Sequence, residues 1–273
     1  MTKIEKEKIP WGEAIKVYIQ GVVAAFATYS TLPMPHLDFS SAAISFTLAG
    51  FPWVGIVLGM LLSLLLVMCE ALGFSALLSA VIFSLASALL TGAIHLDGLA
   101  DCADAIYSRR GREEELRIMK DPHAGPMALI FLSLYLMTET ALIAEWIARS
   151  RVHESQIWAQ ATMIIFLGLS RSLSGRMVLS SPKARPDGMA RMVSDPAPEA
   201  SILILDGLIC LWAVLLLFTQ SWRVILFALF AYVMYQAFRA FVMKRYQGIT
   251  GDLAGLFLSL TELGFHFLLV LLV

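Results

Sequence analysis

Three carboxylates recur at helical spacing in the segment His95-Leu-Asp97-Gly-Leu-Ala-Asp101-Cys-Ala-Asp104, directly after a long apolar run. On a helix at 100° per residue, Asp97, Asp101 and Asp104 fall within about 60° of one another and share one face. Such like charges are tolerated if they are solvated, protonated or bridged by a divalent cation, and all-oxygen ligands suit Mg²⁺, Ca²⁺ or Mn²⁺ rather than zinc. The alternative interpretation is a polar helix end whose acids face the helix dipole.

A second polar segment, Lys120-Asp121-Pro122-His123, comes just before another apolar run. Lys120 could hold a phosphate as a point charge, and Asp121 could complete a metal site. The alternative is that Lys and Arg near the end of a membrane helix follow from topology alone.

Two charged residues, Arg171 and Glu262, stand inside apolar runs. A charge at the middle of a bilayer costs roughly 2.5 kcal/mol or more, so both are expected to face the protein interior. Arg171, flanked by Ser170 and Ser172, is placed to clamp a phosphate through two N–H donors. Glu262 requires a partner such as Arg171, or a proton.

Two further connections carry polar residues at turns. Lys183-Ala-Arg185-Pro-Asp187-Gly188 could cover an anionic substrate or be an ordinary basic loop. Gln247-Gly-Ile-Thr250-Gly-Asp252 leads into the last apolar run, where Asp252 could cap a helix. Carboxylates and cations gathered on one membrane face would suit metal-assisted transfer of a phosphate-bearing group.

The elements that must position these residues are membrane-spanning helices. The chain is 59% hydrophobic and 15% charged, whereas soluble proteins are roughly half apolar and a quarter charged. A stretch of about 20 apolar residues can cross a bilayer. The predicted fold is an all-α bundle, a single integral membrane domain over 1–273. Its seven predicted spans are 39–69, 71–94, 126–148, 156–180, 201–219, 222–243 and 252–273.

The polar connections at 95–125, 181–200 and 244–252 fall on one side when alternate crossings are counted, and they carry most of the Lys and Arg. The positive-inside rule predicts that these candidate active-site loops face the cytoplasm, although Arg149 and Arg151 depart from it mildly. The same count predicts that 1–38 is an amphipathic segment that lies in the interface or re-enters. Its polar side would carry Glu13, Lys16 and Gln20.

Composition also excludes some classes of function. A net charge of -1 and a pI near 6.5 argue against a nucleic-acid partner. The three cysteines lack metal-type spacing and are interpreted as packing residues.

A cation or metabolite transporter is an alternative function. Its midplane pathway would use Arg171, Glu139, Glu145 and Glu262, but the concentration of charge in loops disfavours it.

A set of strings in fixed order resembles one known family, the cobalamin synthases, which are adenosylcobinamide-GDP ribazoletransferases. The strings are LPMP at 32–35, GAIHLDGLADCAD at 92–104, ELRIMKD at 115–121 with Gly125, Arg171-Ser172, Ala184-Arg185 with Gly188, and GITGD at 248–252 with Glu262. The resemblance covers essentially the whole chain. It implies an integral enzyme of the prokaryotic cytoplasmic (inner) membrane that joins adenosylcobinamide-GDP to α-ribazole or its 5′-phosphate. GMP would be released, and Mg²⁺ would be required.

The resemblance also implies roles for individual residues. Asp97, Asp101, Asp104 and Asp121 would hold Mg²⁺ on the diphosphate, which Lys120 and Arg171 would neutralise. Asp252 would be a second ligand or a ribazole contact, and His95, on another side of the helix, a base or orienting group. Arg185, Thr250 and Glu262 complete the expected substrate-binding set. A homo-oligomer, or a complex with other corrinoid-assembly proteins, is compatible with this reading. The enzymatic alternative is a CDP-alcohol-type membrane phosphotransferase, whose longer signature is absent.

Overall fold

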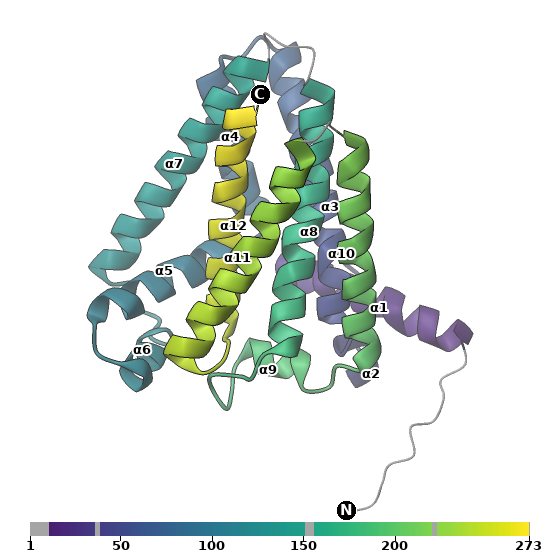
Figure 1. Cartoon of the computed structure of the whole chain (residues 1–273), viewed down its shortest axis with the longest axis vertical. Helices are drawn as coiled ribbons and strands as arrows, with labels where there is room; N and C mark the ends of the chain where they lie inside the picture. Colours follow the sequence, from purple (N-terminus) through teal and green to yellow (C-terminus); the bar gives the residue numbers. More distant parts are fainter. Residues whose placement is uncertain (1–10, 36–38, 151–155, 220–222, 273) are drawn as a thin grey trace, which may run out of the picture.

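The long helices of the chain run side by side as a bundle (Figure 1). The computed structural model describes residues 11–35, 39–150, 156–219 and 223–272. Within these ranges there are twelve helices and no strand, apart from an isolated bridge between Lys183 and Ile249. Six helices are long and apolar enough to cross a membrane, or up to seven if one bent pair counts as a span. The prediction of an all-α bundle with about seven spans is confirmed. The six are α3 (Thr47–Ala71), α7 (Pro126–Ser150), α8 (Gln156–Ser180), α10 (Glu199–Thr219), α11 (Arg223–Tyr246) and α12 (Gly251–Leu272).

The bent pair consists of α4 (Ala76–Leu90) and α5 (Ile94–Ser108), whose axes differ by 90°. The chain turns because Gly92 and Ala93 both adopt left-handed backbone angles, with φ of 61° and 56°. As a consequence α5 leaves the direction of the bundle and crosses near one end of it (Figure 1). The segment 95–125, expected as a loop, is therefore largely helical, since α6 (Arg112–Ile118) follows α5.

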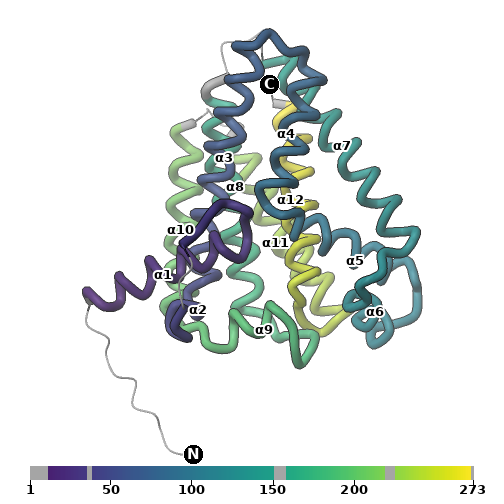
Figure 2. Tube along the Cα trace, turned by 180° about the vertical axis from the view of Figure 1, so that it is seen from behind, coloured from purple at the N-terminus to yellow at the C-terminus, as the bar shows by residue number. Residues whose placement is uncertain are grey.

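The first helix, α1 (Trp11–Tyr29), lies across the bundle and projects from its side (Figures 1 and 2). It is not among the described helices that are long and apolar enough to cross a membrane. Ile15 and Ile19 on this helix are exposed. A transverse helix that exposes apolar side chains suits the membrane interface, in keeping with the sequence expectation. The short α2 (Ser41–Ile44) follows, with the Ser40 hydroxyl accepting from the Ala43 amide at its start.

Helix α8 lies at the centre of the bundle, and its packing depends on glycine. A Cβ at Gly55 of α3 would lie 2.3 Å from the Leu167 carbonyl oxygen of α8, so only glycine permits this approach of the two helices. Large apolar side chains point outward elsewhere; Leu203 and Phe218 of α10 are 71% and 75% exposed. Such positions face hydrocarbon in a membrane protein, where apolar exposure carries no penalty.

One end of the bundle gathers α5, α6 and the short α9 (Met189–Ser194) (Figure 1). Arg112 joins three connections there, because its Nε donates to the Tyr246 carbonyl at 2.8 Å and its Nη2 to the Ala184 carbonyl at 3.2 Å. The connections at 95–125, 181–200 and 244–252 therefore meet at one end, as counting crossings predicts.

Candidate active site

Helices α5 and α12 approach closely at a pair of glycines, and this contact brings carboxylates from the two helices together. A Cβ at Gly98 would lie 2.8 Å from the Asp252 carbonyl oxygen, and one at Gly255 would lie 3.2 Å from the His95 carbonyl oxygen. Side chains at these positions would force the helices apart. Gly98 and Gly255 therefore explain why Asp97 and Asp252 lie at one site.

Asp97 and Asp252 both line a cavity of about 150 Å³ at this contact. His95 is also part of the lining, as is Gly251 at the start of α12. The other lining residues are mostly apolar: Tyr29, Leu48, Phe51, Ile94, Ser174, Val178, Met189, Ala190, Val193, Ala254, Gly255 and Leu258. The cavity thus combines two carboxylates with apolar walls from five helices and the end of α1.

Asp101 lies outside the lining but within the electrostatic influence of this site. It stands on α5, which runs off the axis of the spanning helices. Burial raises the pKa of Asp101 most, the charges of Asp97, Asp252 and Asp104 raise it further, and Arg185 opposes them; together these effects bring the pKa to about 7. The carboxylates are close enough to repel one another, and a bound cation would relieve this repulsion.

Asp252 is held by two neighbours. Arg185 Nη2 donates to Asp252 Oδ2 at 2.6 Å, and the Thr250 hydroxyl lies 3.3 Å from the same oxygen. Thr250 also accepts from the Leu253 amide at 3.2 Å, which caps the first turn of α12. The sequence set Arg185, Thr250 and Asp252 is therefore one connected group at the cavity.

The loop that carries Arg185 is fixed to the turn before α12 through main-chain hydrogen bonds. Ala184 N donates to Ile249 O at 3.0 Å, and Ile249 N donates to Pro182 O at 2.8 Å. A Cβ at Gly248 would lie 2.5 Å from the Pro182 carbonyl oxygen. Glycine at 248 is thus required for the contact that places Arg185 beside Asp252.

Asp104 is engaged at the start of α7. Its carboxylate accepts from Gly125 N at 2.5 Å and from Ala128 N at 2.9 Å. A Cβ at Gly125 would lie 2.7 Å from Asp104 Oδ1, so glycine leaves room for the carboxylate. These contacts satisfy free amides at a helix N-terminus, and they give Asp104 a capping function.

Lys120 and Asp121 lie apart from the cavity lining, in the exposed connection before α7. Lys120 Nζ pairs with Asp187 Oδ2 at 2.5 Å. Asp121 accepts from the His123 amide at 3.0 Å, and its Oδ1 lies 2.8 Å from His123 Nδ1. Lys120 therefore reaches the loop that carries Arg185, whereas the Asp121 carboxylate contacts the nearby His123.

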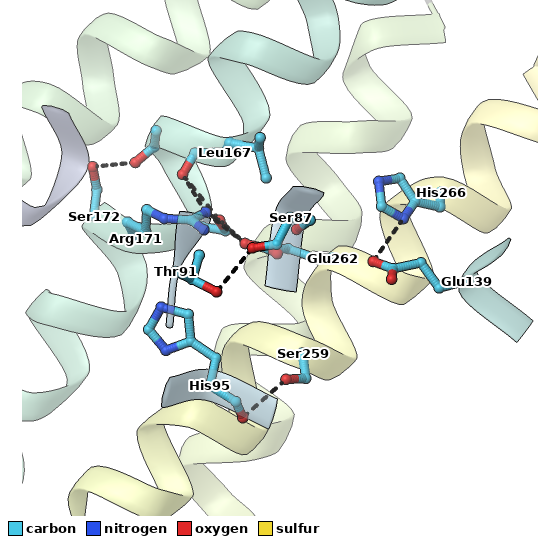
Figure 3. A network of polar contacts seen from close by, with 12 residues as sticks. Ser87, Thr91, His95, Glu139, Leu167, Arg171, Ser172, Ser259, Glu262 and His266 are labelled. Atoms are coloured by element: carbon cyan, nitrogen blue, oxygen red, sulfur yellow. Dashed lines mark hydrogen bonds and ion pairs between the residues drawn. The ribbon is translucent and has the colours of Figure 1, made fainter. Parts of the chain in front are cut away.

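Arg171 and Glu262 pair with each other inside the bundle (Figure 3). Arg171 Nη1 lies 2.5 Å from Glu262 Oε1, and the side chains are 2% and 13% exposed. The Ser170 hydroxyl donates to the same Glu262 oxygen at 3.2 Å. The sequence expectation of a partner for Glu262 is confirmed, while the Arg171 guanidinium is directed to this partner and lies outside the cavity lining.

Further buried polar groups extend from this pair toward α7. The Tyr135 hydroxyl donates to Glu139 Oε1 at 3.3 Å, and His266 Nδ1 lies 3.9 Å from that oxygen (Figure 3 draws Glu139 and His266). These groups line no part of the cavity beside Asp97. They join α7 and α12 within the apolar bundle.

Among the described residues, no group of three or more His, Cys, Asp or Glu side chains is close enough to hold a metal ion. The charge of Asp97 acts on Asp101. Asp104, in contrast, caps α7, and Asp121 accepts from the His123 amide in its own turn. A divalent ion at this site would therefore need oxygen ligands from a bound substrate in addition to these carboxylates.

Sequence reasoning missed the apolar walls of the cavity. Tyr29 and Phe51 come from α1 and α3, and Ala190 and Val193 from α9. An aromatic or aliphatic residue in an apolar helix carries no signal that separates a ligand wall from ordinary packing. Only the long-range contacts among these helices reveal the wall.

Comparison with known proteins gives one consistent family. The family model described as Cobalamin-5-phosphate synthase matches residues 21–271. An adenosylcobinamide-GDP ribazoletransferase of Pseudomonas putida (strain GB-1) is 35% identical over 243 residues, covering 86% of this chain and 91% of that protein. The protein of the same name from Clostridium perfringens (strain SM101 / Type A) is 26% identical over 249 residues, covering 91% and 96%. No solved structure matches this chain.

Proposed function

This chain belongs to the cobalamin-5-phosphate synthase family, and from this premise we propose that it is an adenosylcobinamide-GDP ribazoletransferase. Its reaction takes place at the cavity between α5 and α12. The observation that supports this location is the joint lining of the cavity by Asp97 and Asp252, from two separate family motifs. Family membership favours this transferase over a CDP-alcohol-type phosphotransferase and over a transporter.

The reaction is a phosphoryl transfer between two substrates. The 3′-hydroxyl oxygen of α-ribazole, or of its 5′-phosphate, attacks the phosphorus next to cobinamide and forms a new P–O bond. The bond from this phosphorus to the bridging diphosphate oxygen breaks, and GMP leaves with that oxygen. The hydroxyl proton passes to a neighbouring carboxylate and then to water. Transfers of this kind depend mainly on position and on neutralising charge at the phosphoryl oxygens.

The donor set fits Mg²⁺, since Mg²⁺ is commonly bound by one or two carboxylates together with substrate phosphates. Asp97 and Asp101 are the residues that would hold it; burial and then the neighbouring carboxylates raise the pKa of Asp101, and a cation would relieve the repulsion among these carboxylates. When bound, the ion supplies positive charge to the phosphoryl oxygens of the diphosphate. Asp104 and Asp121 belong to the capping and turn contacts described above, so they take no part in this proposal.

The other polar residues position the substrates. Asp252, fixed by Arg185 and Thr250, accepts a hydrogen bond from a sugar hydroxyl at the cavity. Arg185 keeps an additional buried N–H, its Nε, without a partner among the described residues, and this group can donate to a phosphate oxygen. Lys120, exposed and paired with Asp187, adds positive charge at the approach.

The orientation in the membrane follows from charge. The end that carries α5, α6 and α9 also carries the Lys and Arg clusters of the three connections. By the positive-inside rule this end faces the cytoplasm, with the protein in the cytoplasmic membrane of its bacterium. The nucleotide-bearing substrate would then bind from the cytoplasmic side.

Purified protein in liposomes, supplied with adenosylcobinamide-GDP, α-ribazole and Mg²⁺, should release GMP and a cobalamin in equal amounts. Asp97→Asn should abolish turnover while the protein still inserts. Asp195→Asn is the matched control, because Asp195 is an exposed carboxylate that pairs with Arg191 four residues before it and does not line the cavity. Absence of GMP with both α-ribazole and its 5′-phosphate would overturn the proposed function.

A further inference from the structure

The cavity beside Asp97 has one wall made of three aromatic rings. The Tyr29 and Phe51 ring centroids lie 4.2 Å apart, and the Phe51 and His95 centroids lie 5.7 Å apart. Tyr29 and His95 are stacked at 6.4 Å. These residues come from α1, α3 and α5, so the wall is assembled from distant parts of the chain. Aromatic side chains offer apolar surface and preferred ring-to-ring geometries to a flat ligand.

The remaining walls are aliphatic. Val178 of α8, Val193 of α9 and Leu258 of α12 face the same space. All three are less than a tenth exposed, so the surface that they present to the cavity is shielded from bulk water. Such walls bind an apolar ring and disfavour a ring whose edge carries many polar groups, because those groups would lose water without gaining partners.

The size of the cavity also limits its ligand. Pockets that enclose a drug-sized ligand are roughly 300–1,000 Å³, whereas this cavity measures about 150 Å³. A corrin macrocycle is too large to enter. Guanine is small enough, and Asp97 and Asp252 can accept from its N1–H and N2–H, but the aromatic and aliphatic walls offer few donors to its O6 and N7. A flat, mostly apolar two-ring base meets both limits.

One unsatisfied polar atom belongs to the aromatic wall. His95 Nε2 is buried and has no hydrogen-bond partner among the described residues. An unpaired buried polar atom costs about 1–3 kcal/mol, so a ligand that pairs with it gains affinity. A benzimidazole-type base attached to ribose retains one ring nitrogen that can accept such a hydrogen bond.

We propose that this cavity binds the base of α-ribazole, with its ring on the wall formed by Tyr29 and Phe51. This inference rests on the proposed transferase function and names the part of the substrate that the cavity recognises. The ribose attached to the base then reaches Asp97 and Asp252, which belong to the same lining. The base therefore places the attacking hydroxyl at the carboxylates, while the larger corrinoid substrate stays outside the cavity.

Ala190 of α9 sets the width of the cavity, because it lines the space with only a methyl group. Ala190→Leu should fill part of it and raise the KM for α-ribazole at least tenfold, since each methylene in an apolar pocket is worth about tenfold or more in discrimination. The KM for adenosylcobinamide-GDP should stay within about twofold. Met192→Ala is the matched control, because Met192 lies on the same helix, is 62% exposed and is absent from the lining.

An analogue with imidazole in place of benzimidazole tests whether the loss reflects cavity size. Ala190→Leu should process this smaller analogue about as well as the unsubstituted protein does, which would also show that the variant is folded. Val193→Ala, which enlarges the cavity, should shift preference toward a bulkier base and gives a second test if Ala190→Leu does not fold.

Two results would overturn the assignment of the base. One is a rise in the KM for adenosylcobinamide-GDP with no change for α-ribazole; the other is equal loss with every base. Both are measured on protein whose unsubstituted form makes cobalamin and GMP. Failure of that parent reaction would instead contradict the transferase function itself.

Discussion

Replacing Glu262 by Leu tests whether Arg171 is a structural partner or a ligand for phosphate. The two side chains form a 2.5 Å ion pair and are 13% and 2% exposed. Breaking a buried pair by removing one partner typically costs about 3–5 kcal/mol. Arg171 Nη1 keeps its hydrogen bond to the Leu167 carbonyl at 3.1 Å, so the lower end of that range is expected. A loss of about 3 kcal/mol corresponds to a factor of roughly 150 in the folding equilibrium.

The double variant Arg171→Met with Glu262→Leu should recover most of this loss. Both charges are then absent, and apolar replacements for a buried ion pair are often neutral or stabilising. Glu145→Gln is the matched control, because Glu145 pairs with Arg149 at 2.7 Å but both are about half exposed. Exposed pairs contribute about 0–1 kcal/mol. Unfolding in mixed micelles, followed by tryptophan fluorescence, measures all four proteins.

Activity then decides between the two functions of Arg171. If Arg171 serves only as the partner of Glu262, the folded double variant should keep its KM for adenosylcobinamide-GDP within about threefold. A double variant with parental stability but a KM raised tenfold or more would refute this reasoning. Arg171 would then have to contact the diphosphate, as the sequence analysis expected.

Four further predictions concern the carboxylates and the topology. Because the pKa of Asp101 is raised from 3.8 to about 7 in the metal-free protein, and its carboxyl must lose a proton to hold Mg²⁺, kcat/KM at limiting Mg²⁺ should rise with pH through about 7; Arg185→Met removes a charge that lowers this pKa, so the midpoint should move to higher pH, and a move to lower pH would contradict the assignment. By the same shift, the metal-free protein should lose stability as pH rises from about 4 through 7, a loss that Asp101→Asn should reduce. Asp104→Ala should destabilise the protein by about 1–3 kcal/mol because two amides at the start of α7 lose their acceptor; an unchanged denaturation midpoint would count against the cap. Single cysteines at Ser108, Ala184 and Gln247, in a background without Cys69, Cys102 and Cys210, should all be labelled from one side of the membrane, and labelling from both sides would contradict the topology.

The spanning helices were predictable because a run of about 20 apolar residues is enough to indicate a membrane span. The predicted spans 126–148 and 201–219 agree with α7 and α10 to within a few residues. The right-angled turn between α4 and α5 was not predictable in this way. The backbone angles of Gly92 and Ala93 change the direction of the chain, but they do not change how apolar the run is. The run 71–94 therefore looked like a full span, although α4 has only 15 residues.

The candidate site was predictable in part for a similar reason. Helical spacing placed Asp97, Asp101 and Asp104 on one face, and the charges of Asp97 and Asp104 both raise the pKa of Asp101. Spacing could not show that α7 begins beside Asp104 or that Asp252 lies against Gly98. Those contacts depend on which helices become neighbours, and that information is spread over the whole chain.

The contacts at Gly98 and Asp104 constrain the length of the chain between them. Gly98 rests against α12 and Asp104 against the start of α7, six residues further on (104 minus 98), or about 9 Å along a helix. Inserting one residue between them would rotate Asp104 by about 100° and remove it from Gly125. Insertions at Arg109 to Gly111, beyond the end of α5, would leave both contacts in place. Natural variation in length should therefore concentrate after Ser108 and be absent from residues 98–104.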